Sequence, residues 1–375
     1  MKIAILTHPL DYNYGCLLQA FALQKTIKSM GHDVITINRF STPYQPFHIL
    51  IRGWLSRLLR RLLRGQKVSL VWNPTESMKT KLILSAETQK FVDRNIRNYG
   101  PVFPKDLESI DQKFKFDAYV VGSDQVWLPH FSSNCFLDFV HRDNVIRVFY
   151  AASSGSRCFA DDPNILKKCK DLVKSFSGIS VREDNLIPVV KEYLGRDAIQ
   201  VLDPTMLLDA NEYIDACVEK VETSPIVFTY ILDKTEDKQN LINKVKKDLN
   251  LPVINGTVDK DYVKGKGMDI NQCIYPSVDK WILNLARAKF VVTDSFHGTC
   301  MSIIFRKPFV VVGNASRGLN RFLSVLNLFG LENRLITNSS DFHSDFYLPL
   351  PIDSLESKIN DMRKISFSYL QTYLS

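Results

Sequence analysis

The stretch KFVVTDSFHGTC, residues 289–300, places several polar side chains directly after an apolar run. Among them, His297 has a side chain that can carry charge against an anion or exchange a proton near neutrality, because an ordinary histidine pKa is about 6.5. Backbone N–H groups at a strand-to-helix turn can also bind a phosphate. We therefore expect residues 294–298 to contribute His297 to an anion site. The alternative is a histidine that only bonds a neighbouring carbonyl.

Polar side chains follow other apolar runs in the same way. They are Asn13, Tyr14 and Gly15, then Ser123, Asp124 and Gln125, then Ser153, and then Arg182. Ligands of parallel sheets bind beyond the carboxyl ends of the strands, so these groups together predict a polar cleft that accepts anions. For any one of them, an N-cap or turn role is the simpler interpretation. The planar fork of Arg182 suits a carboxylate or a phosphate, and a structural ion pair with Glu183 is its alternative.

Apolar strand patterns alternate with helical patterns along the whole chain. KIAILTH, DVITINR and VIRVFYAAS are typical of buried strands, and a second series begins with IVFTYIL and continues through KFVVTDS and PFVVVGN. This alternation predicts the α/β class, with parallel sheets covered by helices on both faces. We expect two Rossmann-like domains facing a cleft, at 1–205 and 206–345. A final helix in 346–375 is expected to pack back on the first domain.

Composition indicates a globular protein, with 45% hydrophobic and 23% charged residues in 375. The seven cysteines form no CxxC pair and no Cys/His cluster at zinc spacing, so we expect neither a bound metal nor a disulfide framework. This favours a cytoplasmic setting. The N-terminus is typical of a first strand rather than of a signal peptide, and no stretch reaches the roughly 20 apolar residues that span a bilayer.

The basic charge is concentrated in one segment, about 49–67. Six of the eight net positive charges lie there, and no acidic residue accompanies them. Apolar residues at three-and-four spacing face away from these arginines, which predicts an amphipathic helix for the surface of the inner leaflet. The alternative is that its leucines pack on the protein's own core. Because the charge is local, we expect no nucleic-acid partner.

Several blocks of the sequence together resemble the polysaccharide pyruvyl transferase family. The blocks are YNYGCLLQAFALQ (12–24), DAYVVGSDQVW (117–127), YAASSG (150–155), ISVREDN (179–185), VLDPTMLL (201–208) and FVVTDSFHGTCMSIIFRKPFV (290–310). They cover most of the chain to about residue 330. The sequence contains no GxxxxGK(S/T) phosphate-binding loop, no GxGxxG dinucleotide-binding motif after the first strand, and no GxSxG motif of the α/β-hydrolases. Cys16 departs from the pattern, because a glycine or alanine is common there.

The resemblance implies a glycosyltransferase-B-like fold and a reaction with phosphoenolpyruvate. Its enolpyruvyl group would be transferred to two sugar hydroxyls as a cyclic ketal, with release of phosphate and with no other cofactor. Arg182 and His297 would bind this donor, and Asp124 is our candidate for orienting or deprotonating the acceptor. The substrate-binding candidates are Asn13, Tyr14, Gly15, Ser123, Gln125, Ser153, Asp294, Ser295, Phe296 and Gly298.

The acceptor is expected to be a cell-surface polysaccharide precursor. Segment 49–67 favours one linked to a polyprenyl diphosphate, reached by a peripheral enzyme on the inner face of the membrane. Two other classes stay open. A glycosyltransferase that uses a sugar nucleotide would share the fold and the anionic cleft. A membrane-docked binding protein would share the basic segment, but the concentration of polar strand ends speaks against it.

Replacing four arginines of segment 49–67 with Glu should weaken co-sedimentation with anionic liposomes. Each basic residue near an anionic leaflet contributes about 1 kcal/mol, so four charge reversals replace that attraction with repulsion. Co-sedimentation of the wild-type protein with anionic and with neutral vesicles provides the comparison. Unchanged binding of the variant to anionic vesicles would show that the segment is not a membrane anchor.

Overall fold

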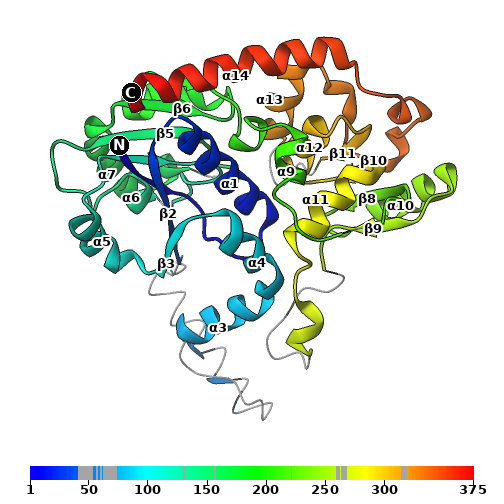
Figure 1. Ribbon diagram of the computed structural model, residues 1–375, viewed down its shortest axis with the longest axis horizontal. Helices are drawn as coiled ribbons and strands as arrows, with labels where there is room; N and C mark the ends of the chain where they lie inside the picture. The colour runs from blue at the N-terminus through cyan, green and yellow to red at the C-terminus, as the bar shows by residue number, and fades with distance from the viewer. Residues whose placement is uncertain are drawn as a thin grey trace.

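The computed structural model describes residues 1–40, 74–129, 132–155, 158–220, 222–258, 268–313 and 319–375, together with residues 54, 55, 58, 59, 61 and 262. These residues form two parallel sheets with helices on both faces, one in each half of the molecule (Figure 1). The predicted α/β class with two Rossmann-like units is therefore confirmed. The domain boundaries at 205 and 345 stay predictions.

The first sheet has seven strands in the order β3-β2-β1-β4-β5-β6-β7, and all its pairs are parallel. The strands are β1 (Lys2–Leu6), β2 (Asp33–Arg39), β3 (Asn98–Val102), β4 (Ala118–Val121), β5 (Ile146–Ala152), β6 (Gly178–Val181) and β7 (Ile199–Gln200). This is the Rossmann order with one added strand, and the order reverses between β1 and β4. Residues of β4 and β6 are buried throughout, as a sheet covered on both faces requires.

The second sheet has five parallel strands in the order β12-β11-β10-β8-β9. They are β8 (Ile226–Tyr230), β9 (Val253–Asn255), β10 (Ala288–Thr293), β11 (Phe309–Val312) and β12 (Leu335–Ile336). This is the other common doubly wound order, and its reversal lies between β8 and β10.

Helices cover both sheets. They are α1 (Tyr14–Ser29), α3 (Pro74–Leu84), α4 (Ala86–Asn95), α5 (Leu107–Phe114), α6 (Ser132–Cys135), α7 (Pro163–Leu172), α8 (Leu186–Val189), α9 (Ala210–Ile214), α10 (Glu236–Leu249), α11 (Val278–Arg287), α12 (Phe296–Ile304), α13 (Asn320–Phe329) and α14 (Ile352–Leu374). The long helix α14 runs from the second half back over the first (Figure 1). There the Tyr369 hydroxyl donates to the carbonyl of Phe149, at 2.8 Å, and Ser366 Oγ accepts from the backbone of Leu202.

One apolar cluster extends through both halves of the molecule. It includes Leu18 of α1, Phe228 of β8, Trp281 of α11 and Leu370 of α14, all buried. The outer face of each sheet has a separate cluster of its own. Burial of apolar side chains is the main favourable term in folding, so the shared cluster holds the two halves against each other.

Two local differences from the sequence expectation have physical causes. The pattern over 77–98 predicts only helix, but β3 begins at Asn98 and pairs with β2. Its Gly100 and Pro101 are poor strand formers, and proline is tolerated because β3 is an edge strand. The helix expected from about Thr299 begins instead at Phe296, because Ser295 Oγ accepts from the backbone of Gly298 and caps it.

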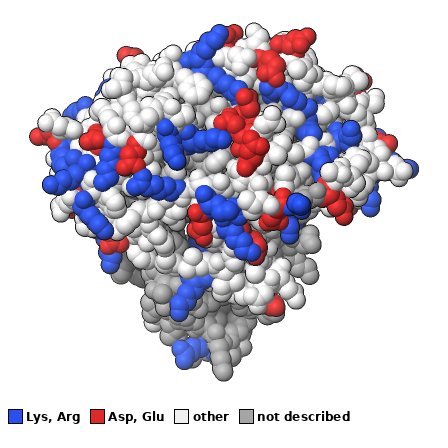
Figure 2. Space-filling model, in the orientation of Figure 1, with Lys and Arg blue, Asp and Glu red and all other residues white. Residues whose placement is uncertain are grey.

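Most of the predicted amphipathic segment 49–67 lies outside the described residues. Its described members are helical, and the side chains of Trp54, Leu55 and Leu59 are 43%, 45% and 53% exposed. Among the described residues, no helix is both long and apolar enough to cross a bilayer. On the face drawn in Figure 2, basic side chains are interspersed with acidic ones.

Replacing Leu370 with alanine should lower the free energy of unfolding by about 2–5 kcal/mol, because its side chain is fully buried in the shared cluster. Ile365 on the same helix is the matched control. Its side chain is 45% exposed, and its replacement by alanine should change stability by less than about 0.5 kcal/mol. Urea denaturation measures both, and equal effects would contradict the described packing of α14.

Candidate functional site

The positions where the strand order reverses lie next to each other in this molecule. In the first sheet, the loops after β1 and β4 carry Asn13 and Asp124. In the second sheet, the loop after β8 carries Leu232, and the helix that follows β10 carries His297 in its first turn. Ligands of doubly wound sheets bind at such reversals, since neighbouring loops diverge there. Both reversals therefore offer their loops to the same region between the halves.

Helix N-termini from the two halves touch at Gly15 and His297. A Cβ built on Gly15 of α1 would lie 2.1 Å from Nδ1 of His297, on α12. Any side chain at position 15 would therefore displace the histidine. Residue 15 needs to be glycine to leave room for this approach.

Arg182 lies buried among carboxylates that three different loops supply. Its Nε donates to Glu183 at 2.9 Å, and its two terminal nitrogens donate to Asp203 at 3.1 Å and to Asp124 at 3.4 Å. The remaining N–H group donates to Ser153 Oγ at 3.0 Å. All five guanidinium donors thus have acceptors. The ion pair with Glu183 forms as the alternative interpretation expected, and the direct contact of Arg182 with a substrate anion stays a prediction.

Phe296 and His297 bring the second half onto this cluster. The ring of Phe296 covers the guanidinium of Arg182, with 4.0 Å between the guanidinium carbon and the ring centroid. His297 Nε2 lies 3.7 Å from Asp203 Oδ2, and this buried nitrogen has no hydrogen-bond partner among the described residues. A protonated His297 would therefore meet a carboxylate.

Both buried aspartates of the cluster are held as carboxylates. Burial opposes ionisation of Asp124, but the nearby His8, Arg182 and His297 outweigh it and lower the pKa of Asp124. The pKa of Asp203 is lowered in the same sense, against burial, by His297 and Arg182 and by a hydrogen bond from Thr205. Ser123 Oγ lies 3.1 Å from Asp203 and contributes a further donor.

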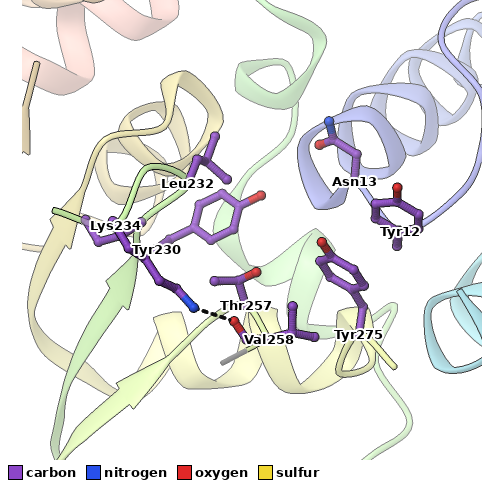
Figure 3. Close-up of a pocket in the computed structure, with 9 residues that line it drawn as sticks. Tyr12, Asn13, Tyr230, Leu232, Lys234, Thr257, Val258 and Tyr275 are labelled. Carbon is purple, nitrogen blue, oxygen red and sulfur yellow. Dashed lines mark hydrogen bonds between the residues drawn. The ribbon is translucent and has the colours of Figure 1, made fainter. Parts of the chain in front are cut away.

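A cavity of about 230 Å³ lies beside this cluster, between the halves. It is lined by Tyr12, Asn13, Tyr230, Ile231, Leu232, Lys234, Thr257, Val258 and Tyr275. Figure 3 shows Tyr12 and Asn13 on one side and Tyr230 and Lys234 on the other. The ring of Tyr230 also borders Gly298, since a Cβ there would lie 3.2 Å from Tyr230 Cδ1. Tyr230 thus borders both the cavity and Gly298, the neighbour of His297, and His297 itself is not among the residues that line the cavity.

Comparison with known families decides which family this is. A model of the family described as polysaccharide pyruvyl transferase matches residues 13–316, most of the chain. The chain belongs to the polysaccharide pyruvyl transferase family. It is a transferase, as its resemblance implied, and the match includes the loops that form the buried cluster.

Two solved structures show some likeness to this chain. UDP-GlcNAc 2-epimerase from Neisseria meningitidis, bound to UDP-GlcNAc, is 10% identical, with 98% of this chain and 94% of that chain covered and a TM-score of 0.47. MnaA of S. aureus with UDP is 14% identical, with 97% and 91% covered and a TM-score of 0.49. Since neither score reaches 0.5, the fold is assigned from the strand orders. Among curated proteins, none matches the chain significantly.

Asp294 of the transferase supports the cavity wall from behind. Its carboxylate accepts from the backbone N–H groups of Leu232, at 2.6 Å, and Asp233, at 2.9 Å, and pairs with Lys238 at 2.7 Å. Its side chain is 2% exposed. A direct contact between Asp294 and a substrate stays a prediction, and the contacts it makes here fix the loop after β8.

Of the remaining predicted residues, Asn13 and Gln125 lie in loops of the first half, whereas Tyr14 and Gly298 are packed inside the protein. Asn13 lines the cavity, and Gln125 lies beside Gly155 in the loops of the first half. Tyr14 does not face the cavity with its hydroxyl, which donates to the carbonyl of Pro276 at 2.8 Å, and burial raises its pKa. Gly298 packs against Thr293, with no space for a side chain.

Sequence reasoning did not identify the cavity residues Tyr230, Lys234, Thr257 and Tyr275 or the partner role of Asp203. Asp203 directly follows the apolar residues Val201 and Leu202, so the signal used for His297 could have found it. Tyr230 is the last residue of β8 and lies inside the predicted strand IVFTYIL, so that signal does not apply to it. Cysteine spacing also gave no metal cluster, although the fold brings His8, Cys16 and Asp124 together, with ligand atoms within 4.8 Å of one another.

Gly15→Ala should lower the free energy of unfolding by about 1–3 kcal/mol, the usual cost of overpacking, because the added methyl group collides with His297. In a His297→Ala background the same change should cost far less, since the ring is gone. A double-mutant cycle in urea measures the coupling. Equal costs in both backgrounds would show that the two residues do not contact.

Proposed function

We propose that this transferase moves the enolpyruvyl group of phosphoenolpyruvate onto two hydroxyls of a sugar. The product is a cyclic pyruvate ketal, and phosphate is released. The observation that carries the proposal is the position of His297, in the first turn of α12, beside Asp203 and next to Gly298, which borders Tyr230 of the cavity wall. There, a proton donor and a helix N-terminus that favours anions come together.

Ketal formation requires a proton on the enol methylene carbon and the loss of phosphate from its neighbour. One acceptor hydroxyl adds to that neighbouring carbon, the C–O bond to phosphate breaks, and the second hydroxyl closes the ring. Of the two hydroxyl protons lost, one balances the new methyl group and the other leaves with phosphate. We assign the first proton transfer to His297, because imidazole is the commonest general acid in proteins and its Nε2 lies 3.7 Å from Asp203 Oδ2, which can orient the ring.

Asp124 suits an orienting role better than that of a general base. A general base works best when its pKa lies near the operating pH, and the pKa of Asp124 is lowered by its cationic neighbours. Its carboxylate can still accept a hydrogen bond from a sugar hydroxyl. Arg182 is assigned the role of holding Asp124 and Asp203 in place, since its donors already meet both.

The cavity suits the sugar acceptor in shape and chemistry. Tyr12 and Tyr275 stack with 4.4 Å between ring centroids, and exposed aromatic faces pack well against the C–H faces of a sugar. Asn13, Thr257 and Lys234 add polar groups that can hold hydroxyls or a diphosphate. Such a pocket, apolar rings with a few convergent polar groups, is typical of a small-molecule site.

We also propose that the acceptor is a polysaccharide precursor linked to a polyprenyl diphosphate. The support is the basic segment 49–67, whose described members Trp54, Leu55 and Leu59 have exposed apolar side chains. An enzyme docked at the inner leaflet would reach such an acceptor. A glycosyltransferase using a sugar nucleotide is the alternative, and it is favoured if a nucleoside diphosphate rather than phosphoenolpyruvate stabilises the protein against heat.

Incubation with phosphoenolpyruvate and a lipid-linked oligosaccharide should add the mass of pyruvate less water to the acceptor and release one phosphate. His297→Ala should slow phosphate release by a factor of about 100 or more, because it removes a proton donor and a cation near the leaving group. Mass spectrometry and a phosphate assay measure the two effects.

His343→Ala is the matched control for this experiment. His343 lies in the second half with its side chain 61% exposed, and its loss should leave the rate unchanged. A His297→Ala variant that releases phosphate at the wild-type rate would contradict the assignment. No mass gain with any of several acceptors would contradict the proposed reaction.

A further inference from the structure

Three side chains of metal-binding type converge beneath the cavity, beside the Arg182 cluster. His8 follows β1, Cys16 lies in the first turn of α1, and Asp124 follows β4. One ligand atom from each lies within 4.8 Å of the others. Cys16 and Asp124 are almost fully buried. The three side chains come from the two connections that follow β1 and β4, where the strand order of the first sheet reverses.

Their spacing is close to what a tetrahedral zinc ion requires. Zinc–sulfur and zinc–nitrogen bonds of about 2.3 and 2.0 Å place neighbouring ligand atoms about 3.5 Å apart. Cys16 Sγ and Asp124 Oδ2 are already 3.3 Å apart. The ligand atom of His8 lies within 4.8 Å of both.

The surroundings orient two of these side chains towards one another. Asp124 presents Oδ1 to Arg182 and leaves Oδ2 facing Cys16. His8 hydrogen bonds to the backbone of Gln125, and metal-binding histidines commonly use one ring nitrogen in this way while the other binds the ion. Asp124 also has a φ of 69°, in the left-handed region, and strained residues of this kind cluster at functional sites.

Charge provides an independent argument for a cation here. The guanidinium of Arg182 faces three carboxylates, those of Asp124, Glu183 and Asp203, all buried. Counted alone, these four side chains carry one positive and three negative charges, which leaves two excess negative charges away from water and is costly. A divalent ion bound to Asp124 would offset this excess.

We propose that His8, Cys16 and Asp124 bind one divalent ion of the zinc class. Thiolate and imidazole ligands select zinc or cobalt over magnesium or calcium, and three protein ligands leave a fourth position for water or a substrate oxygen. On binding, the Cys16 thiol releases its proton to solvent and forms a metal–sulfur bond in place of its hydrogen bond to Asp124. The site does not depend on the identity of the donor substrate.

Cobalt titration of the full-length, chelator-treated protein tests the site. One equivalent of Co²⁺ should bind and give a thiolate-to-cobalt charge-transfer band, which zinc then removes by displacement. Cys16→Ala should abolish the charge-transfer band. His8→Ala should weaken cobalt binding by more than roughly 10- to 100-fold, which is the usual loss when a residue that only hydrogen bonds to a metal ligand is removed. Cys217→Ala is the control, because this thiol lies elsewhere and bonds to Tyr213.

A wild-type protein that binds no stoichiometric cobalt would overturn the proposal, as would a charge-transfer band that persists in Cys16→Ala. Circular dichroism establishes whether the variants fold. If a variant does not fold, X-ray absorption of the wild-type protein with bound cobalt is the decisive measurement. We expect one sulfur ligand together with nitrogen and oxygen ligands, and a shell made only of oxygen ligands would contradict the proposal. Neither readout uses phosphoenolpyruvate, so the proposed reaction can fail while the metal site stands.

Discussion

The centre of this molecule is organised by the need to pair one buried guanidinium. An arginine taken out of water is tolerated only when its charge and donors are satisfied, and losing one partner of such a pair typically costs about 3–5 kcal/mol. For Arg182 the acceptors come from the loops after β4, β5, β6 and β7. The ion cluster therefore fixes the geometry of four strand ends at once. Phe296 closes it from the second sheet.

This arrangement explains how an acidic centre could serve an anionic donor. The carboxylates of Asp124 and Asp203 do not face the donor as free charges, because Arg182 lies between them. What remains of their field favours a cation nearby, such as the metal ion that we propose at Asp124.

The sequence predicted the architecture well and the site only in part. Apolar runs ending in polar residues located β1, β4, β8 and β10, and their loops do meet. The local pattern could not separate His297 from Asp294. Among the described residues, His297 Nε2 has no hydrogen-bond partner, whereas both carboxylate oxygens of Asp294 accept from N–H groups distant in the sequence. That distinction depends on contacts between residues that lie about 60 positions apart in the chain. The cluster of His8, Cys16 and Asp124 was missed because sequence rules for zinc sites describe ligands close together in the chain, and Asp124 is more than 100 residues from the other two.

The apolar cluster shared by the two halves has a consequence for how the chain can be divided. Neither half has a complete core, since residues such as Leu18 and Trp281 are buried in the same cluster from opposite sides. Expressed alone, the first or the second half would present that surface to water and tend to aggregate. The two Rossmann-like units are therefore complementary fragments of one folding unit, and a gene fusion or a circular permutation would have to keep both.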